Sequence, residues 1–223
     1  RAQDLVRACD LYHCAFAVTA GPTGLELART RANLGSLEYD ARDFEAALTA
    51  DRAAIAQATA ALGAGHPLVG QLVTQEAFAL ESLGRIEEAR SRLESSTGAW
   101  SLILRSRLDA RRRRFAAAQA SATQALAATD ASDVLTRINA ETALADALTD
   151  PDAAAPRYTA ALARCQATYG EAHPIHASFR QRAAAGLLRL ARPAEALVHL
   201  RRALQIGETL ADNDLAATAE TRR

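Results

Sequence analysis

Apolar residues recur along this chain with the spacing of amphipathic α-helices, and short polar turns interrupt them at intervals. In one well-marked stretch, Gly35 lies within an apolar run, a turn follows at residues 41–43, and Phe44 opens the next apolar run. Small and polar residues of this kind end one helix and begin another. The pattern predicts two helices here, over about residues 25–41 and 44–62, joined by a tight turn.

This pattern returns along most of the chain. The apolar residue and alanine at Phe44 and Ala47 recur after 42, 29, 36 and 42 residues, at Ile86 and Ala89, Phe115 and Ala118, Pro151 and Ala154, and Pro193 and Ala196. Self-similarity of this kind is typical of a helical repeat array. We therefore expect an all-α fold, a right-handed α-solenoid of antiparallel helix pairs, over residues 21–210. The pairs are expected at about 25–41 with 44–62, 68–83 with 86–97, 99–112 with 115–129, 132–148 with 151–169, and 175–190 with 193–210.

The two ends are expected to differ from the repeats. Residues 1–20 have the pattern of one amphipathic helix, which we interpret as the second helix of a preceding repeat, serving as a cap. Residues 211–223 are polar and form either a short capping helix or a frayed tail. Because Arg1 is not a methionine, we expect the chain to be a piece of a longer protein.

Small residues mark the positions where helices are expected to cross closely. Gly35, Ala77 and the alanines of the repeated pair lie at such positions. A larger side chain there would overpack the crossing by roughly 1–3 kcal/mol. The acidic residues are scattered, and we expect them at solvated helix positions.

Composition limits the classes of function. Hydrophobic residues make up 49% of the chain but aromatic residues only 4%, so alanine and leucine are expected to build the core. The net charge is zero, which argues against general attraction to nucleic acid or anionic membranes. All 26 positive charges are arginine, and lysine and methionine are absent, a bias that indicates a high-GC bacterial genome. No apolar run reaches the roughly 18 residues that span a bilayer.

The repeats resemble tetratricopeptide repeats, and most of all the 42-residue kind of kinesin light chains and many bacterial signalling proteins. The resemblance covers about residues 25–210 and depends on Asn33-Leu34-Gly35, Leu62-Gly63, His66-Pro67, Gly84-Arg85-Ile86, Ala89, Gly170 and His173-Pro174. Some positions depart from the pattern. Asp43 and Arg113 stand where the first and third repeats would have a turn glycine, and Pro151 and Pro193 replace the usual aromatic residue.

The resemblance implies that the first helices of the repeats line a concave groove in which a peptide or partner segment binds. Mapped onto the repeat pattern, the groove positions are Arg29, Asn33, Ser36, Tyr39, Gln71, Thr74, Gln75, Phe78, Trp100, Ile103, Arg107, Arg111, Asn139, Gln181, Arg182 and Arg189. The arginines among them, with aromatic residues between, suit an acidic partner segment that carries one or two apolar anchors.

Three features of this surface each allow two interpretations. Asn33 is either an ordinary helix surface residue or the asparagine that, in peptide-binding relatives, hydrogen-bonds the ligand backbone or its terminal carboxylate. The lysines that complete this carboxylate clamp in the family are absent here. Trp100 either fills the core or anchors a partner. The arginine run 111–114 is either a solvated turn or a patch for phosphate or carboxylate groups.

We expect no enzyme activity, no cofactor and no metal site in this chain. It has neither a glycine-rich phosphate loop nor a nucleophile elbow. His66 and His173 belong to the His-Pro turns, and no Cys or carboxylate completes a metal site with His173 and His176. Three cysteines without metal-site spacing are expected as small buried side chains: Cys9, Cys14 and Cys165.

The sequence thus predicts a scaffold that binds a protein or peptide partner, with no nucleic acid, in the cytoplasm. The alternative is the C-terminal sensory or substrate-recruiting part of a larger bacterial signalling enzyme, such as a serine/threonine protein kinase, or of a transcriptional regulator. A periplasmic location would follow if that kinase were anchored in a membrane. Self-association through the groove or the terminal helices is a third alternative.

Overall fold

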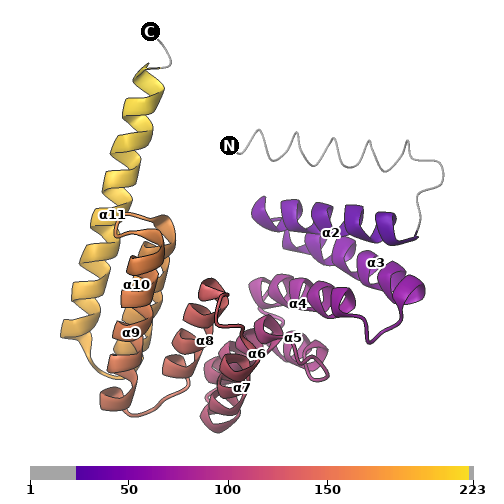
Figure 1. Cartoon of the computed structure of the whole chain (residues 1–223), viewed down its shortest axis with the longest axis horizontal. Helices are drawn as coiled ribbons and strands as arrows, with labels where there is room; N and C mark the ends of the chain where they lie inside the picture. Colours follow the sequence, from indigo (N-terminus) through magenta and orange to yellow (C-terminus); the bar gives the residue numbers. More distant parts are fainter. Residues whose placement is uncertain (1–23, 221–223) are drawn as a thin grey trace. The chain divides into compact units, whose positions relative to one another are not determined.

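The computed structural model of the chain describes residues 24–220, with side chains through residue 211. This range contains ten α-helices and no strand (Figure 1), which confirms the expected all-α class. The helices are α2 (Gly24–Asp40), α3 (Phe44–Leu62), α4 (Pro67–Ser82), α5 (Ile86–Arg92), α6 (Ala99–Arg111), α7 (Phe115–Ala128), α8 (Val134–Asp146), α9 (Pro151–Tyr169), α10 (Pro174–Arg189) and α11 (Pro193–Glu220). The helix expected over residues 1–20 lies outside the described residues.

Most helix ends lie within two residues of the expected positions, but two helices differ. α5 ends at Arg92, whereas the pattern predicted a helix to residue 97. Residues 93–98 form turns and an irregular stretch instead, because their Ser, Thr and Gly residues favour local backbone hydrogen bonds over a helix. α11 passes residue 210 without a break and ends at Glu220.

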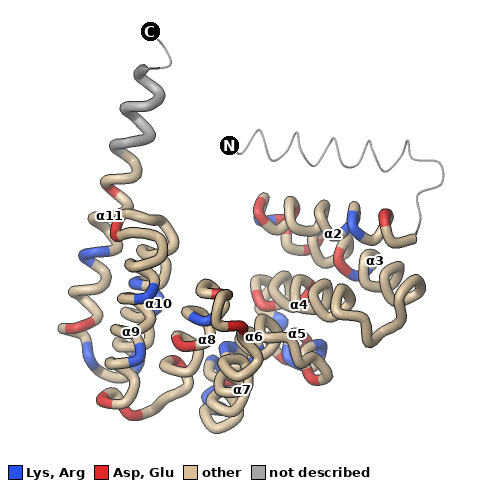
Figure 2. The backbone as a smooth tube through the Cα atoms, viewed as in Figure 1, with Lys and Arg blue, Asp and Glu red and all other residues tan. Residues whose placement is uncertain are grey.

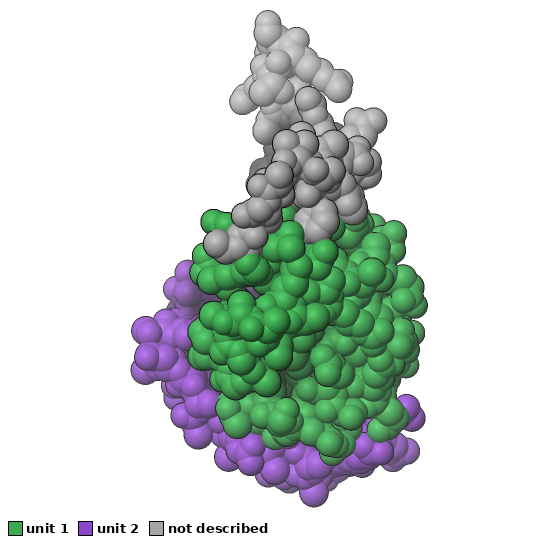
Figure 3. Space-filling model, turned by 90° about the vertical axis from the view of Figure 1, so that its right-hand side faces the viewer, with its two compact units in different colours: residues 1–108 green, residues 109–223 purple. Residues whose placement is uncertain are grey.

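The chain forms two compact units, residues 1–108 and 109–223, which are coloured separately in Figure 3. In the first unit α2 packs against α3, α3 against α4, and α4 against α5. In the second unit α7 packs against α8, α8 against α9, and α10 against both α9 and α11. Each unit is therefore a series of helix hairpins in which a helix contacts its sequence neighbours, as in repeat proteins.

Charged residues of both signs are interspersed along the helices of each unit (Figure 2). Many form exposed pairs such as Arg90 with Glu94, 3.0 Å apart and four residues apart on one helix. Such a pair contributes only about 0.3–0.5 kcal/mol. Among the described helices, none is both long and apolar enough to cross a membrane.

Side chains at the turns cap the helices that follow. Asp43 accepts a hydrogen bond from the backbone N–H three residues further on, at the start of α3. In the two His-Pro turns the imidazole is the acceptor: His66 Nδ1 lies 3.2 Å from Leu68 N, and His173 Nδ1 lies 3.1 Å from Ile175 N. The proline after each histidine occupies the first helical turn, where no N–H is needed. The structural role expected for these histidines is confirmed.

Several tight turns between paired helices contain one residue in the left-handed conformation. It is a glycine at Gly84, with φ 76°, but Arg42, Arg113 and Ala191 occupy the corresponding positions with φ 67°, 61° and 59°. The turn position of the first repeat is thus Arg42, and its assignment to Asp43 was wrong by one residue. A side chain in this region costs roughly 1–2 kcal/mol of local strain, which the packing of the two helices offsets.

Small residues build the core of both units. The alanines of the repeated pair, Ala47, Ala89, Ala118, Ala154 and Ala196, are at most 1% exposed. This burial confirms that the repeat marks close helix crossings, where backbones approach because no long side chain separates them.

At Gly35 the close neighbour is a carboxylate. A Cβ on Gly35 would overlap Asp51 Oδ1, would lie 3.1 Å from the Cγ of Asp51 and would lie 3.3 Å from Gln75 Nε2. The absence of a side chain at residue 35 therefore leaves space for the side chain of Asp51 on α3.

Three buried acidic residues, Asp51, Glu76 and Asp109, contradict the expectation that acidic residues lie at solvated helix positions. Asp51 and Glu76 are each 1% exposed. Glu76 is paired with Arg52 at 3.0 Å and with Arg92 at 2.7 Å. Asp51 Oδ1 has no hydrogen-bond partner among the described residues. Burial and, next, repulsion from Glu76 raise the pKa of Asp51 to about 7, against a smaller lowering effect of the Gln75 amide.

In the second unit a buried tyrosine passes close to a glycine. Tyr158 is 1% exposed, and a Cβ on Gly186 would overlap its hydroxyl group. The hydroxyl donates a hydrogen bond to Asp146 Oδ1 at 2.7 Å. Burial and the neighbouring Asp146 raise the pKa of Tyr158, so the hydroxyl remains a donor.

Two histidines lie next to an arginine between α10 and α11. His176 is completely buried, and its Nδ1 lies 3.1 Å from the carbonyl oxygen of Glu171, which requires a proton on Nδ1. Arg180 Nη1 lies 3.5 Å from His199 Nδ1, and no described carboxylate forms an ion pair with Arg180. Burial, followed by Arg180, lowers the pKa of His199, and burial together with Arg180 and Arg202 also lowers the pKa of His176.

We expect Gly35→Ala to lower the free energy of unfolding by about 1–3 kcal/mol, because the added methyl group would overlap the Asp51 carboxylate. Gly70→Ala in α4 is the matched control. No described atom outside its own helix backbone lies within 4 Å of a Cβ at residue 70, so this change should gain about 1 kcal/mol of helix propensity. Urea unfolding followed by circular dichroism measures both. Equal effects would contradict the close approach at Gly35.

The stability of the first unit should depend on the protonation of Asp51. The ordinary pKa of 3.8 applies to the unfolded chain and a pKa of about 7 to the folded one, so the folded chain binds an extra proton between these values. The contribution of protonated Asp51 to the free energy of unfolding is complete below pH 4, and it is lost as the pH rises through 7. Between pH 5 and pH 8 the free energy of unfolding of the wild type should therefore fall by about 2–3 kcal/mol relative to that of Asp51→Asn, which cannot ionise. Urea unfolding of both proteins at the two pH values tests this, and parallel pH profiles would refute it.

The α10–α11 hairpin should weaken on acidification. The folded-state pKa values of His176 and His199 lie below the ordinary 6.5. The two neutral imidazoles therefore contribute to the free energy of unfolding above pH 6.5, and this contribution is lost as the pH falls below that value. Hydrogen exchange of the α10 backbone amides, corrected for intrinsic rates, should be faster at pH 5 than at pH 7. The variant His176→Gln with His199→Gln should lack this difference. Unchanged protection in the wild type at pH 5 would show that the histidines are not held neutral.

Candidate functional site

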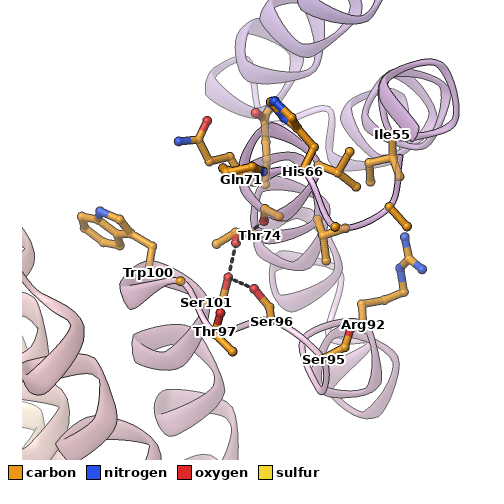
Figure 4. Close-up of a pocket in the computed structure, with 18 of the residues that line it drawn as sticks. Ile55, His66, Gln71, Thr74, Arg92, Ser95, Ser96, Thr97, Trp100 and Ser101 are labelled. Carbon is orange, nitrogen blue, oxygen red and sulfur yellow. Dashed lines mark hydrogen bonds between the residues drawn. The ribbon is translucent and has the colours of Figure 1, made fainter. Parts of the chain in front are cut away.

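The shortness of α5 opens a pocket in the first unit. α5 has 7 residues, whereas the second helices of the first and fourth repeats, α3 and α9, have 19 each. Where further turns of α5 would lie, a pocket of about 930 Å³ is bounded by α3, α4, residues 95–98 and the start of α6 (Figure 4). This volume is within the range of ligand-binding pockets.

Helix α4 divides the lining of this pocket into two halves. In Figure 4, Gln71 and Trp100 lie on one side of α4, and Ile55 and Arg92 lie on the other. Residues four and seven positions after Gln71 share its helix face. The α6 half consists of Ser36, Gln71, Gln75, Phe78 and Trp100. The α3 half consists of Ile55, Thr59, Val69, Val73 and Arg92.

A chain of hydroxyl groups fixes the start of α6 against α4. Thr74 Oγ1 donates to the carbonyl oxygen of Gly70 at 2.9 Å, and its hydroxyl lies 2.5 Å from Ser101 Oγ. Ser96 Oγ in turn donates to Ser101 Oγ at 2.6 Å (Figure 4). Thr74 and Ser101 are buried. These bonds hold Trp100, which is the neighbour of Ser101, at the edge of the pocket.

A second, smaller pocket of about 190 Å³ adjoins the α6 half. Arg29 and Asn33 on α2 and Gln71 and Gln75 on α4 supply its polar lining. Because Gln71 and Gln75 line both pockets, the two form one hollow along the face of α2 and α4. Eight of the residues that the sequence assigned to a groove are brought together here: Arg29, Asn33, Ser36, Gln71, Thr74, Gln75, Phe78 and Trp100.

The amide of Gln75 connects the two helices that form this hollow. Its Nε2 donates to the carbonyl oxygen of Ala32 at 2.8 Å and to Ser36 Oγ at 3.0 Å. Asp51 Oδ1 and Gln75 Nε2 both lie beside the position that a Cβ of Gly35 would take, so the floor of the hollow lies next to the buried carboxylate. The orientation of Gln75 is therefore set by contacts within the chain.

Two other predicted groove residues of the first unit lie outside the pockets. The Tyr39 hydroxyl lies 3.1 Å from Ser82 Oγ. Arg107 Nη2 lies 3.2 Å from both carboxylate oxygens of Glu81, and the guanidinium carbon lies 5.9 Å from the centre of the Phe78 ring. The charge of Arg107 is thus balanced by its own chain.

The predicted residues of the second unit stabilise its helix packing. Arg182 Nε donates to Asp146 Oδ2 at 2.9 Å, and Arg182 Nη1 lies 3.5 Å from Asn139 Oδ1. Arg189 Nη2 donates to the carbonyl oxygens of Asp146 and Leu148 at 2.8 and 3.1 Å. These bonds join α10 to the end of α8.

The structure corrects one groove assignment and decides one open interpretation. Ile103 is fully buried in the helix packing, whereas Thr74, although buried, contributes to the lining of the large pocket. Trp100 is 37% exposed, so it does not fill the core. The run 111–114 is exposed at the turn from α6 to α7, which both a solvated turn and an anion-binding patch would show, and Arg114 in it is 3.7 Å from buried Asp109. Arg111 is the last residue of α6.

The sequence analysis missed the α3 half of the pocket. It gave the residues of this half no role, and it expected α5 to extend to residue 97. The run Ser95-Ser96-Thr97-Gly98 is a signal that could have indicated the early end of α5, since clusters of these residues are typical of loops.

Nothing in the described part of the chain resembles a metal centre, since no group of three or more His, Cys, Asp or Glu side chains could hold an ion there. Cys165 is a buried free thiol whose pKa is raised by burial, and this disfavours the reactive thiolate. Cys9 and Cys14 lie outside the described residues.

Comparisons with solved structures identify the fold. No family model matches the sequence, and no curated protein matches it. Among solved structures, the chain is similar to BtubC (BKLC) from P. vanneervenii, with a TM-score of 0.65 and 18% identity over 94% of this chain and 91% of that one. It is also similar to a protein of Podosopora anserina described as a kinesin light chain with nearly identical TPR-like repeats. That match has a TM-score of 0.59 and 17% identity over 84% of this chain and 97% of that one.

At these identities the similarity concerns the fold. Within this chain, one repeat pattern recurs. It consists of helix hairpins, alanines at the helix crossings and His-Pro turns in which the imidazole caps the next helix. The chain has the tetratricopeptide-repeat fold.

Proposed function

We propose that the first unit binds an extended peptide segment of a partner protein along α2 and α4. The observation that carries this proposal is the hollow formed by two adjoining pockets that share Gln71 and Gln75. A peptide lying in it would pass from Arg29 and Asn33 at one end to Trp100 at the other.

The side chains of the hollow match the chemistry of a peptide. Gln71 is exposed and forms no side-chain hydrogen bond within the described part of the chain, so its amide offers both a donor and an acceptor to a peptide backbone. Trp100 and the half-buried Phe78 offer apolar surface for one anchoring side chain. Arg29 forms no ion pair among the described residues, and it suits one carboxylate of the partner.

The expected partner is therefore less acidic than the arginine content of the predicted groove indicated. Arg107 is paired with Glu81, and Arg182 with Asp146. A single carboxylate together with an apolar anchor is the composition that the hollow supports.

A peptide selected from a random library against the purified chain should bind with a micromolar dissociation constant, as is usual for transient partners. We expect Gln71→Ala and Trp100→Ala each to weaken binding about 5- to 30-fold, because truncating a contact at the centre of an interface costs about 1–2 kcal/mol. Fluorescence anisotropy of the labelled peptide measures this. Gln119→Ala, an exposed helix position in the second unit, is the control. Selected peptides whose affinity is unchanged by both substitutions would exclude this hollow as the binding site.

A further inference from the structure

The second repeat lacks helical turns that the first repeat has. α3 is 12 residues longer than α5, which corresponds to about 18 Å of helix. Six residues, 93–98, separate α5 from α6, so this part of the chain cannot supply the missing turns and still reach the start of α6. The chain therefore leaves open a place that a second helix fills in the first repeat.

A comparison of the first two repeats shows what a helix at this place would contact. In the first repeat Ala28 of α2 is fully buried in one cluster with Ala54 and Ala58 of α3. The corresponding residue of the second repeat, 42 positions later, is Gly70. Outside its own helix backbone, no described atom lies within 4 Å of where a Cβ of Gly70 would be. A helix-crossing position is thus present on α4 without a crossing helix.

The remaining lining of the α3 half combines three apolar side chains with the polar Thr59 and Arg92, and it is neutral overall. Ile55 and Val73 are half-buried, and Val69 is buried. Arg92 is the one charged residue of this half, and its guanidinium is paired with buried Glu76 at 2.7 Å. This half therefore offers no unpaired charge to a charged ligand. An uncharged helix face, in contrast, could pack on its apolar side chains.

We propose that the α3 half of the pocket receives a helix of about three turns from a partner protein, with alanine-sized residues on the face that it buries. Small residues are required because a helix can approach Gly70 closely only if its own side chains at the crossing are short. This helix completes the second repeat in the way that the second half of α3 completes the first. The proposal is independent of the peptide site in the α6 half, since the two lie on different sides of α4.

The chain itself provides a probe for this site. A capped synthetic peptide with the sequence of residues 50–62 carries Ala54 and Ala58 at the required spacing. With a fluorescent label, it should bind the full chain with a dissociation constant on the order of 100 µM, because a short free peptide loses entropy when it becomes helical. Peptides with Glu at both alanine positions should bind at least tenfold more weakly. Absence of binding by the parent peptide up to 1 mM, or equal binding of the two peptides, would overturn the proposal.

Variants of the chain localise the binding. Gly70→Leu fills the crossing position and should abolish peptide binding without lowering the melting temperature, since the space at residue 70 is open. Thr59→Arg, on the opposite wall, is a second blocking variant if Gly70→Leu folds poorly. Gln71→Ala, in the α6 half, should leave binding of this helix unchanged, which separates this site from the peptide site. Binding that persists in both blocking variants, or that is lost in Gln71→Ala, would show that the helix does not occupy the α3 half.

Discussion

Close approach of helix backbones at alanine and glycine positions is the constraint on which this fold depends. The buried alanines of the repeated pair allow adjacent helices to pack directly against one another. Each alanine buries little area, so stability comes from many short contacts rather than from a few large side chains. The same constraint explains the pocket beside α5. With only 4% aromatic residues and no methionine, the chain has few bulky apolar side chains that could fill a place where a helix ends early.

The periodic part of the structure could be predicted from the sequence. The alanine repeat fixed the order of the helices and most of their ends, because a 3.6-residue pattern and a turn signal agree at each of these places. The early end of α5 could not be derived from the repeat, which gives every repeat equal helices. It depends on residues 95–98, whose local preference for a loop outweighs the pattern. The left-handed residue at Arg42 was likewise misplaced by one position, because sequence patterns fix turns less accurately than helices.

The polar contacts of the candidate site were less predictable. Eight of the predicted groove residues line the two adjoining pockets, since the repeat relates equivalent helix faces. Whether an arginine on such a face is available to a ligand depends on its neighbours in three dimensions. Arg107 and Arg182 each lie beside a carboxylate from another helix, Glu81 or Asp146, and no sequence spacing indicates these pairs. The buried position of Asp51 was missed for a similar reason. Its place on the helix is a core position, and only a glycine on the facing helix leaves space for its carboxylate.

That pairing of a glycine with a buried carboxylate has a consequence for how the sequence can change. A glycine inside a helix is normally an easy site for improvement, because alanine is the better helix former. Here the benefit at Gly35 becomes accessible only after Asp51 has been replaced by a smaller residue, since the two side chains would occupy the same space. The effects of the two substitutions are therefore not additive. Of the two orders in which they can arise, one passes through a destabilised intermediate and the other does not, so the history of one residue determines which changes the other tolerates.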